Sequence, residues 1–213
     1  MTSLVHLVRH GEVENPRNLV YADLPGFHLS RRGQREAAWT GDFLASRPIE
    51  AVYSSPLDRA METASVIAGY HGLEPKPIDR LTEWTLMNRW KGLPWIDLDT
   101  HRPGELERYL KDPTRMDFAP ESLQDLADRI ALTVAGLASR SPDGEIVAVS
   151  HQDPIQAARL VLTGQPLSDL HSAKPHHCEA ISLAPGRPWS ETGRIVPDIR
   201  QEPLGGATLP QHP

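Results

Sequence analysis

The sequence is short of cysteine, of long hydrophobic runs and of positive charge. Cys178 is the only cysteine among 213 residues, so an intramolecular disulfide is impossible, and a lone thiol is typical of a reducing compartment. The apolar run at residues 4–8 ends at Arg9, which makes it too short for a secretory leader or a membrane span. We therefore expect a cytoplasmic protein that does not insert into membranes.

Acidic residues outnumber basic ones, with 28 Asp and Glu against 22 Lys and Arg and a formal charge of −6. This balance disfavours a broad nucleic-acid-binding surface but allows a small anion to bind in a local cationic pocket. The chain has 10 histidines, yet His176 and His177 are the only adjacent pair, and a Cys-x2-Cys spacing is impossible with one cysteine. We expect no metal and no cofactor.

Strand-like and helix-like segments alternate along the chain. Apolar, β-branched runs predict strands at residues 4–8, 49–53, 75–78 and 145–150, and an edge strand at 180–183. Apolar periodicity predicts helices at residues 31–46, 56–70, 121–140 and 153–162. This alternation predicts a three-layer α/β sandwich whose mainly parallel central sheet is flanked by helices on both faces.

The same pattern predicts one domain over residues 1–196, with two segments outside the alternation. Residues 84–120 form a long connection, which we interpret as a lid or a partly helical subdomain that selects the substrate. Residues 197–213 are rich in proline and glycine and predict a surface or disordered tail. Helix starts are expected at Ser30, at Ser55-Pro56 and at Asp153-Pro154, as caps followed in two cases by proline.

The chemistry lies where the predicted strands end. The first strand leads into Arg9-His10-Gly11, the second leads through Ser54-Ser55-Pro56 to Arg59, and the fourth leads into His151. Because the carboxyl ends of parallel strands meet at one edge of a sheet, these side chains should converge in a crevice. Helix N-termini and arginine forks provide the donors that a phosphoryl group needs, and histidine can provide a nucleophile.

Three motifs carry a specific resemblance. They are LVRHGE at residues 7–12, SSPLDRAMETA at residues 54–64, and VSH at residues 149–151. In this order and spacing they resemble the histidine phosphatase (phosphoglycerate mutase-like) superfamily, and the resemblance extends from residue 3 to about residue 183. It implies a phosphoglycerate mutase-like fold and an enzyme that acts on a small phosphorylated metabolite.

The resemblance also implies roles for individual residues. His10 would attack phosphorus as a neutral imidazole whose other nitrogen is held by a carbonyl, and Glu83, in the family's L-x-E element, would protonate the leaving group. The phosphoryl oxygens would be held by Arg9, Arg59 and His151, with further contacts from Gly11, Asn15 and the backbone of Gln152. Asn15 lies one position earlier than in typical mutases, and Gln152-Asp153 replaces the usual glycine pair.

Simpler interpretations stay open for several residues. Glu83 fits a solvated loop carboxylate as well, in which case Glu12 becomes the next candidate acid. His6 is expected to be a buried histidine satisfied by a neighbour, and His28, His176 and His177 receive no role.

We expect a metal-independent phosphomonoesterase. One alternative is a phosphomutase, but the segment after Glu83 lacks the arginine-tyrosine and paired-arginine elements of glycolytic mutases. The other is a non-catalytic phospho-ligand-binding module, which typically loses a histidine or an arginine of the motifs. The expected partner is a small phosphorylated metabolite rather than nucleic acid or a membrane, and a homodimer is left open.

Overall fold

A computed structural model describes residues 4–141 and 143–199. Its centre is a six-stranded sheet in the order β3-β2-β4-β1-β5-β6. The strands are β1 (Leu4–Arg9), β2 (Ile49–Ser54), β3 (Lys76–Pro77), β4 (Glu145–Ser150), β5 (Ala180–Ala184) and β6 (Ser190–Ile195). Strands β1 to β4 are parallel, whereas β5 and β6 join as antiparallel neighbours. The mainly parallel α/β fold is confirmed.

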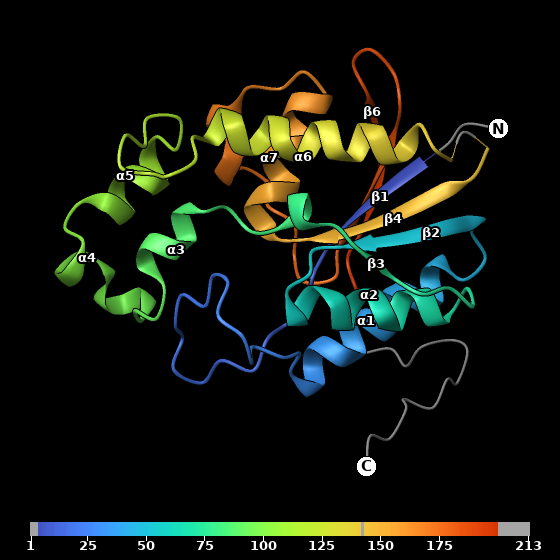
Figure 1. The fold of residues 1–213 in the computed structure, drawn as a ribbon, viewed down its shortest axis with the longest axis horizontal. Coiled ribbons are helices and arrows are strands. Elements are labelled where there is room, and N and C mark those ends of the chain that lie inside the picture. Colours follow the sequence, from blue (N-terminus) through green and yellow to red (C-terminus); the bar gives the residue numbers. More distant parts are fainter. Residues whose placement is uncertain (1–3, 142, 200–213) are drawn as a thin grey trace.

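Helices cover both faces of the sheet, as Figure 1 shows. One layer holds α1 (Arg31–Leu44) and α2 (Asp58–Gly69), and the opposite layer holds α6 (Leu123–Ala138) and α7 (Gln152–Leu162). The short helices α3 (Leu86–Trp90), α4 (Leu98–His101) and α5 (Glu105–Lys111) extend beyond the sheet at the left of the view. Three single turns of 3-10 helix complete the described elements, namely η1 (Asp79–Leu81), η2 (Trp95–Asp97) and η3 (Leu167–His171).

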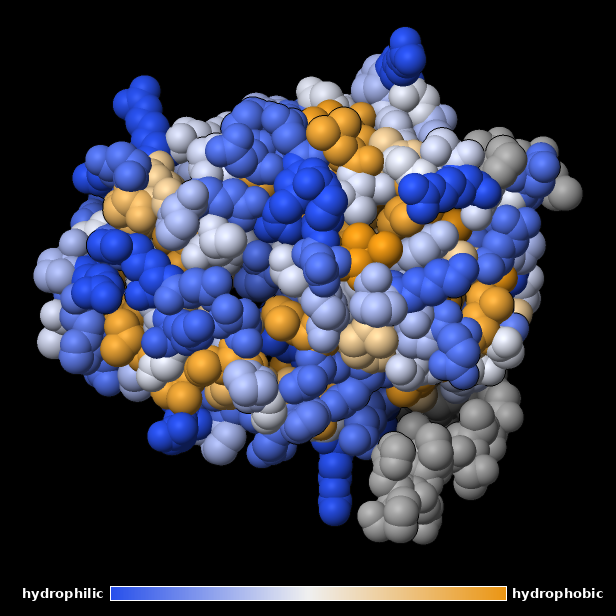
Figure 2. Space-filling view, viewed as in Figure 1, coloured by the Kyte–Doolittle hydropathy of each residue, from blue (hydrophilic) through white to orange (hydrophobic). Residues whose placement is uncertain are grey.

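Alternating side chains of the strands build a core on each face, because successive residues of a strand point to opposite sides. On one face, the apolar stripe of α6 packs with Leu7 of β1 and Ile146 of β4. On the other face, Ala64 and Ile67 of α2 pack with Val8. The large exposed apolar side chains of the described residues are few and well separated in sequence, namely Phe43, Ile96, Leu110, Leu132 and Val196. Figure 2 accordingly shows separate apolar patches on a mostly hydrophilic face.

Four sequence-based expectations are wrong in detail. β5 is an internal strand, because β6 pairs with it and forms the edge. β6 was missed because its sequence, SETGRI, is polar and mostly exposed. Helix α2 begins at Asp58 rather than Pro56, and α7 begins at Gln152 with His151 as its N-cap residue rather than Asp153.

Other local expectations are confirmed. The Ser30 hydroxyl caps α1 by accepting a hydrogen bond from the Gly33 N–H. The connection at residues 84–120 is partly helical, since it contains α3, η2, α4 and α5. The single-domain boundary stays a prediction, and residues 200–213 of the predicted tail lie outside the described residues. Over the described part of the chain, no helix is both long and apolar enough to cross a membrane.

Helix α6 offers a matched test of the core. Ile130 is fully buried, whereas Leu132, two positions further on, is 68% exposed. We expect Ile130→Ala to lower the free energy of unfolding by about 2–5 kcal/mol, because it removes packed methyl groups and leaves a cavity. Leu132→Ala should change it by less than about 0.5 kcal/mol. Urea denaturation measures both, and equal losses would contradict the packing described for α6.

Candidate active site

The strand ends predicted from sequence meet at one edge of the sheet. β1 and β4 pair in register through Arg9 and Ser150, and the N–H of His10 continues the ladder to the Ser150 carbonyl at 3.0 Å. Ser55, just beyond β2, donates its N–H to the carbonyl of Val149 at 2.9 Å. A cavity of about 610 Å³ opens at this edge, and Arg9, His10 and Glu83 line it.

His10 is held with one ring nitrogen committed to the backbone. Its Nδ1 lies 2.8 Å from the carbonyl of Gly11, so Nδ1 carries the proton and donates. This leaves the lone pair on Nε2. Burial, reinforced by Arg59, His151 and Arg9, lowers the pKa of His10 well below its usual value. The imidazole is therefore neutral near pH 7, which is the form that a nucleophile needs.

Two glycines allow the turn after His10 to lie against α1. A β-carbon on Gly11 would lie 2.7 Å from the carbonyl oxygen of Gly33, and one on Gly33 would lie 2.1 Å from the carbonyl oxygen of Glu12. Neither position has room for a larger residue. The N–H of Gly11 donates to the hydroxyl of Thr63 at 3.0 Å, which fixes the turn to α2.

Arg9 of β1 lines the cavity, and Arg59 of α2 is buried in contact with the lining residues Tyr21 and Ala22. Arg9 donates from one terminal nitrogen to the side chain of Gln152 at 2.7 Å and to the carbonyl of Pro175 at 3.0 Å. Arg59, which is 1% exposed, donates to the carbonyl of Ala22 at 2.8 Å and lies over the ring of Tyr21. Among the described residues, the buried Nε of each arginine has no hydrogen-bond partner. The N–H groups at these two positions are suited to oxygens of a bound oxyanion.

His151 connects Arg59 to Ser55. Its Nδ1 lies 3.2 Å from a terminal nitrogen of Arg59, which donates, so Nε2 carries the proton and donates to the Ser55 hydroxyl at 2.8 Å. Burial and the neighbouring arginines Arg59 and Arg9 lower the pKa of His151 well below its usual value. Ser55 was expected to cap a helix, but its hydroxyl orients this histidine.

Glu83 lies near the ring nitrogen of His151 that faces Arg59, and its side chain is 16% exposed. One carboxylate oxygen is 3.9 Å from Nδ1 of His151, and the other accepts the N–H of Trp84 at 2.8 Å. Burial and the nearby charge of Asp153 raise the pKa of Glu83 to about 7, against the opposing effect of Arg59. A carboxyl group with this pKa can give and take a proton near neutral pH.

Asn15 and Gln152 are the two remaining residues predicted to contact the phosphoryl group. Gln152 and Asn15 both line the cavity. The side chain of Asn15 makes two hydrogen bonds with the backbone of Leu19, at 2.9 and 3.0 Å, and so closes its own loop. The side chain of Gln152 holds Arg9 at the rim. The contact of either residue with phosphate stays a prediction.

Sequence reasoning missed a buried polar cluster beside Glu83. The Tyr109 hydroxyl donates to the Asp153 carboxylate at 2.7 Å, and Lys174 lies 3.6 Å from the same carboxylate and 3.2 Å from the hydroxyl. Tyr109 and Asp153 both line the cavity. The departure from the family's glycine at position 153 was the available signal, because a buried carboxylate requires partners.

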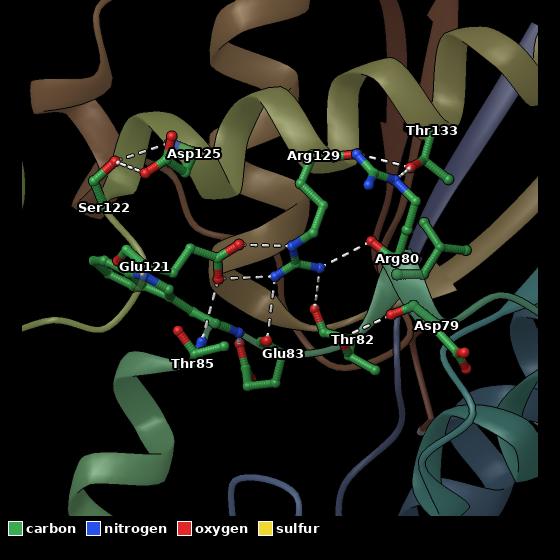
Figure 3. Close-up of polar contacts among 12 residues, drawn as sticks. Asp79, Arg80, Thr82, Glu83, Thr85, Glu121, Ser122, Asp125, Arg129 and Thr133 are labelled. Carbon is green, nitrogen blue, oxygen red and sulfur yellow. Dashed lines mark hydrogen bonds and ion pairs between the residues drawn. The ribbon is translucent and has the colours of Figure 1, made fainter.

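Sequence reasoning also missed the brace that holds the Glu83 loop, shown in Figure 3. Arg129 of α6 pairs with both carboxylate oxygens of Glu121, at 2.7 and 3.0 Å. Its guanidinium also donates to three backbone carbonyls of the loop, those of Arg80, Thr82 and Glu83, at 2.9, 3.1 and 3.4 Å. The helix and the loop are far apart in sequence, so no local pattern reveals this contact.

The other histidines occupy three different kinds of position: the core, the surface and the cavity. His6 is buried between the Ser182 hydroxyl at 2.9 Å and the Glu145 carboxylate at 2.8 Å, as expected of a satisfied core histidine. His28 pairs with Glu62 on the surface. His177 lines the cavity with its ring centroid 5.8 Å from that of His10.

One group of side chains in the described residues has metal-ligand geometry. Ligand atoms of Glu12, Glu36 and His177 lie within 4.8 Å of one another. Arg32 already pairs with both carboxylates, at 3.5 Å from Glu12 and 2.9 Å from Glu36. A cation there would compete with this guanidinium.

Comparison with known proteins identifies the class. The sequence profile of the histidine phosphatase superfamily (branch 1) matches residues 5–189. The chain belongs to this superfamily, and it is an enzyme of the histidine phosphatase class. The predicted family is thus confirmed.

Individual relatives agree with this assignment. An uncharacterized protein of Mycobacterium tuberculosis is 39% identical over 187 residues, covering 84% of this chain and 87% of its own. Phosphoserine phosphatase 1 of Hydrogenobacter thermophilus is 32% identical over 168 residues, covering 78% and 79%. The native structure of a mycobacterial glucosyl-3-phosphoglycerate phosphatase matches with a TM-score of 0.75 at 26% identity, covering 86% of this chain and 90% of that one.

The Arg129 brace predicts a measurable loss of stability. Arg129→Met should lower the free energy of unfolding by roughly 2–4 kcal/mol, because it leaves the Glu121 carboxylate and three carbonyls without their charged donor. Arg80→Met is the matched control, since Arg80 is exposed and its side chain donates a hydrogen bond to the Thr133 hydroxyl at the surface. Thermal unfolding at neutral pH compares them. Similar melting temperatures for the two variants would show that the brace contributes little.

Proposed function

We propose that the protein hydrolyses a small phosphomonoester in two steps through a phosphohistidine at His10, without a metal ion. The observation that carries the proposal is the placement of an imidazole with a free Nε2 beside the half-buried Arg9 and the buried Arg59, whose buried Nε atoms have no hydrogen-bond partner among the described residues. Relatives named as phosphatases of small phosphorylated compounds support it. The lone, buried Cys178 is consistent with a cytoplasmic location.

In the first step, Nε2 of His10 attacks phosphorus and the bond from phosphorus to the ester oxygen breaks. The Gly11 carbonyl holds the Nδ1 proton, so the developing positive charge on the ring is stabilised. Arg9 and Arg59 bind the phosphoryl oxygens, where their charge is worth most as negative charge accumulates. The leaving alkoxide takes the proton of Glu83.

In the second step, water attacks the phosphohistidine and the bond between phosphorus and Nε2 breaks. The Glu83 carboxylate, now deprotonated, takes a proton from that water. Inorganic phosphate leaves, and both His10 and Glu83 return to their starting forms. Since one group serves as acid and then as base, a pKa of about 7 suits both steps.

The nucleophile is tested by His10→Ala. We expect turnover of phosphomonoesters to fall by about 10⁴-fold or more, because no other group attacks phosphorus. Rapid quenching with labelled substrate should trap an acid-labile, base-stable phosphoprotein in the wild type and in His177→Ala, a control histidine in the same pocket. Substantial turnover by His10→Ala would rule out the covalent route. Efficient transfer of phosphate to an added alcohol instead of water would favour the mutase alternative.

The acid is tested by Glu83→Gln with two kinds of substrate. Hydrolysis of alkyl phosphates should fall by about 10²–10⁴-fold, whereas p-nitrophenyl phosphate should be nearly spared, because its leaving group needs little protonation. In the wild type, kcat/KM for alkyl phosphates should fall about tenfold per pH unit above pH 7, since the protonated acid is then lost. The variant should lack this alkaline limb. Equal losses on both substrates would instead indicate a positioning role for Glu83.

A further inference from the structure

Beyond the arginines, the cavity wall is acidic and aromatic. Four acidic side chains line it, those of Glu12, Glu14 and Asp153, and that of Glu83, which the proposed reaction uses as a protonated acid. Its large apolar and aromatic members are Met87, Trp95, Tyr21 and Tyr109. Three of these, Met87, Trp95 and Tyr109, come from the connection at residues 84–120, whereas most of the other lining residues come from the loop at residues 12–22.

Cations are scarce on the same wall. Arg9, His10 and His177 are the basic members of the lining. Burial, together with Arg9 and Arg32, lowers the pKa of His177 to about 3, so this ring is neutral, as His10 is. Arg9 is therefore the charged cation of the lining, and the proposed reaction uses it to bind the phosphoryl group.

Two further cations near the lining, Lys174 and Arg32, are already paired. Lys174 lies behind Tyr109 and is 3.6 Å from the Asp153 carboxylate. Arg32 is paired with Glu36 at 2.9 Å. By contrast, Glu14 is exposed at the cavity and forms no ion pair with a described residue at salt-bridge distance. A carboxylate or second phosphate on the substrate would meet negative charge on this wall, and Arg9 is the charged cation of the lining.

We propose that the substrates are phosphomonoesters whose alcohol carries no second anionic group, namely polyol or sugar monophosphates and phosphorylated amino alcohols. This inference rests on the proposed function. Aromatic rings pack against the C–H faces of such alcohols, and carboxylates accept hydrogen bonds from hydroxyl and ammonium groups. The cavity of about 610 Å³ is of ordinary size for a small-molecule site.

Matched pairs of substrates test the proposal. Phosphoethanolamine differs from phosphoserine by one carboxylate, and glycerol phosphate differs from phosphoglycerate by a hydroxymethyl group in place of a carboxylate. We expect kcat/KM to be at least about tenfold higher for the member without the carboxylate in each pair. Each compound is also measured as a competitive inhibitor of p-nitrophenyl phosphate hydrolysis, so that slow substrates still report their affinity. Equal values, or a preference for the carboxylated members, would overturn the proposed substrate class.

A charge change on the wall tests the cause. Glu14→Lys should reduce the ratio of kcat/KM values within each pair by several-fold, because it places a cation on the wall that a substrate carboxylate would face. Glu74→Lys is the control, since Glu74 is exposed and absent from the cavity lining while the change in net charge is the same. An unchanged preference in Glu14→Lys, or an equal shift in Glu74→Lys, would refute the acidic wall as the cause. Absence of His10-dependent hydrolysis of p-nitrophenyl phosphate would refute the proposed function itself.

Discussion

The site depends on keeping the guanidinium of Arg59 buried close to that of the half-buried Arg9. Arg59 is almost completely buried, and an arginine in a protein cannot release its proton to escape the cost of desolvation. The neighbouring groups are therefore ones that can lie beside a buried positive charge. The two imidazoles beside it stay neutral, the Tyr21 ring lies over the guanidinium at 4.6 Å, and the carbonyl of Ala22 accepts one of its protons. This leaves a positive site matched to an oxyanion.

The surroundings of Glu83 have opposing effects on the pKa of its carboxyl group. Burial and Asp153 favour its neutral form, while Arg59, the Trp84 N–H and Arg9 favour its ionised form. The Tyr109 hydroxyl and the Lys174 ammonium hold the Asp153 side chain in place, which fixes its position relative to Glu83. The proton affinity of the proposed acid is thus set by residues of α5, α7 and the η3–β5 connection, as well as by its own loop.

Sequence predicted what local chemistry determines. Arg9, His10 and His151 were found because each follows a buried strand, and the carboxyl ends of adjacent parallel strands must meet. Ser30 was recognised because a cap bonds within one turn of helix. The β6 edge strand escaped because its polar residues carry no apolar alternation, and β5 was consequently misplaced at the edge. The contacts of Arg129 with the Glu83 loop, and of Tyr109 with Asp153, span 46 and 44 positions in the chain, so only the packed fold brings them together.

Two groups of residues in the site are distributed differently along the sequence. The arginines and histidines come from strand ends scattered from β1 to α7, and each depends on the register of the whole sheet. Met87, Trp95 and Tyr109 come from one continuous stretch that enters after η1 and leaves before α6. A single insertion, deletion or recombination event within that stretch would change these three lining residues at once while the sheet stayed intact. The fold therefore allows ligand preference to diverge faster than reaction chemistry.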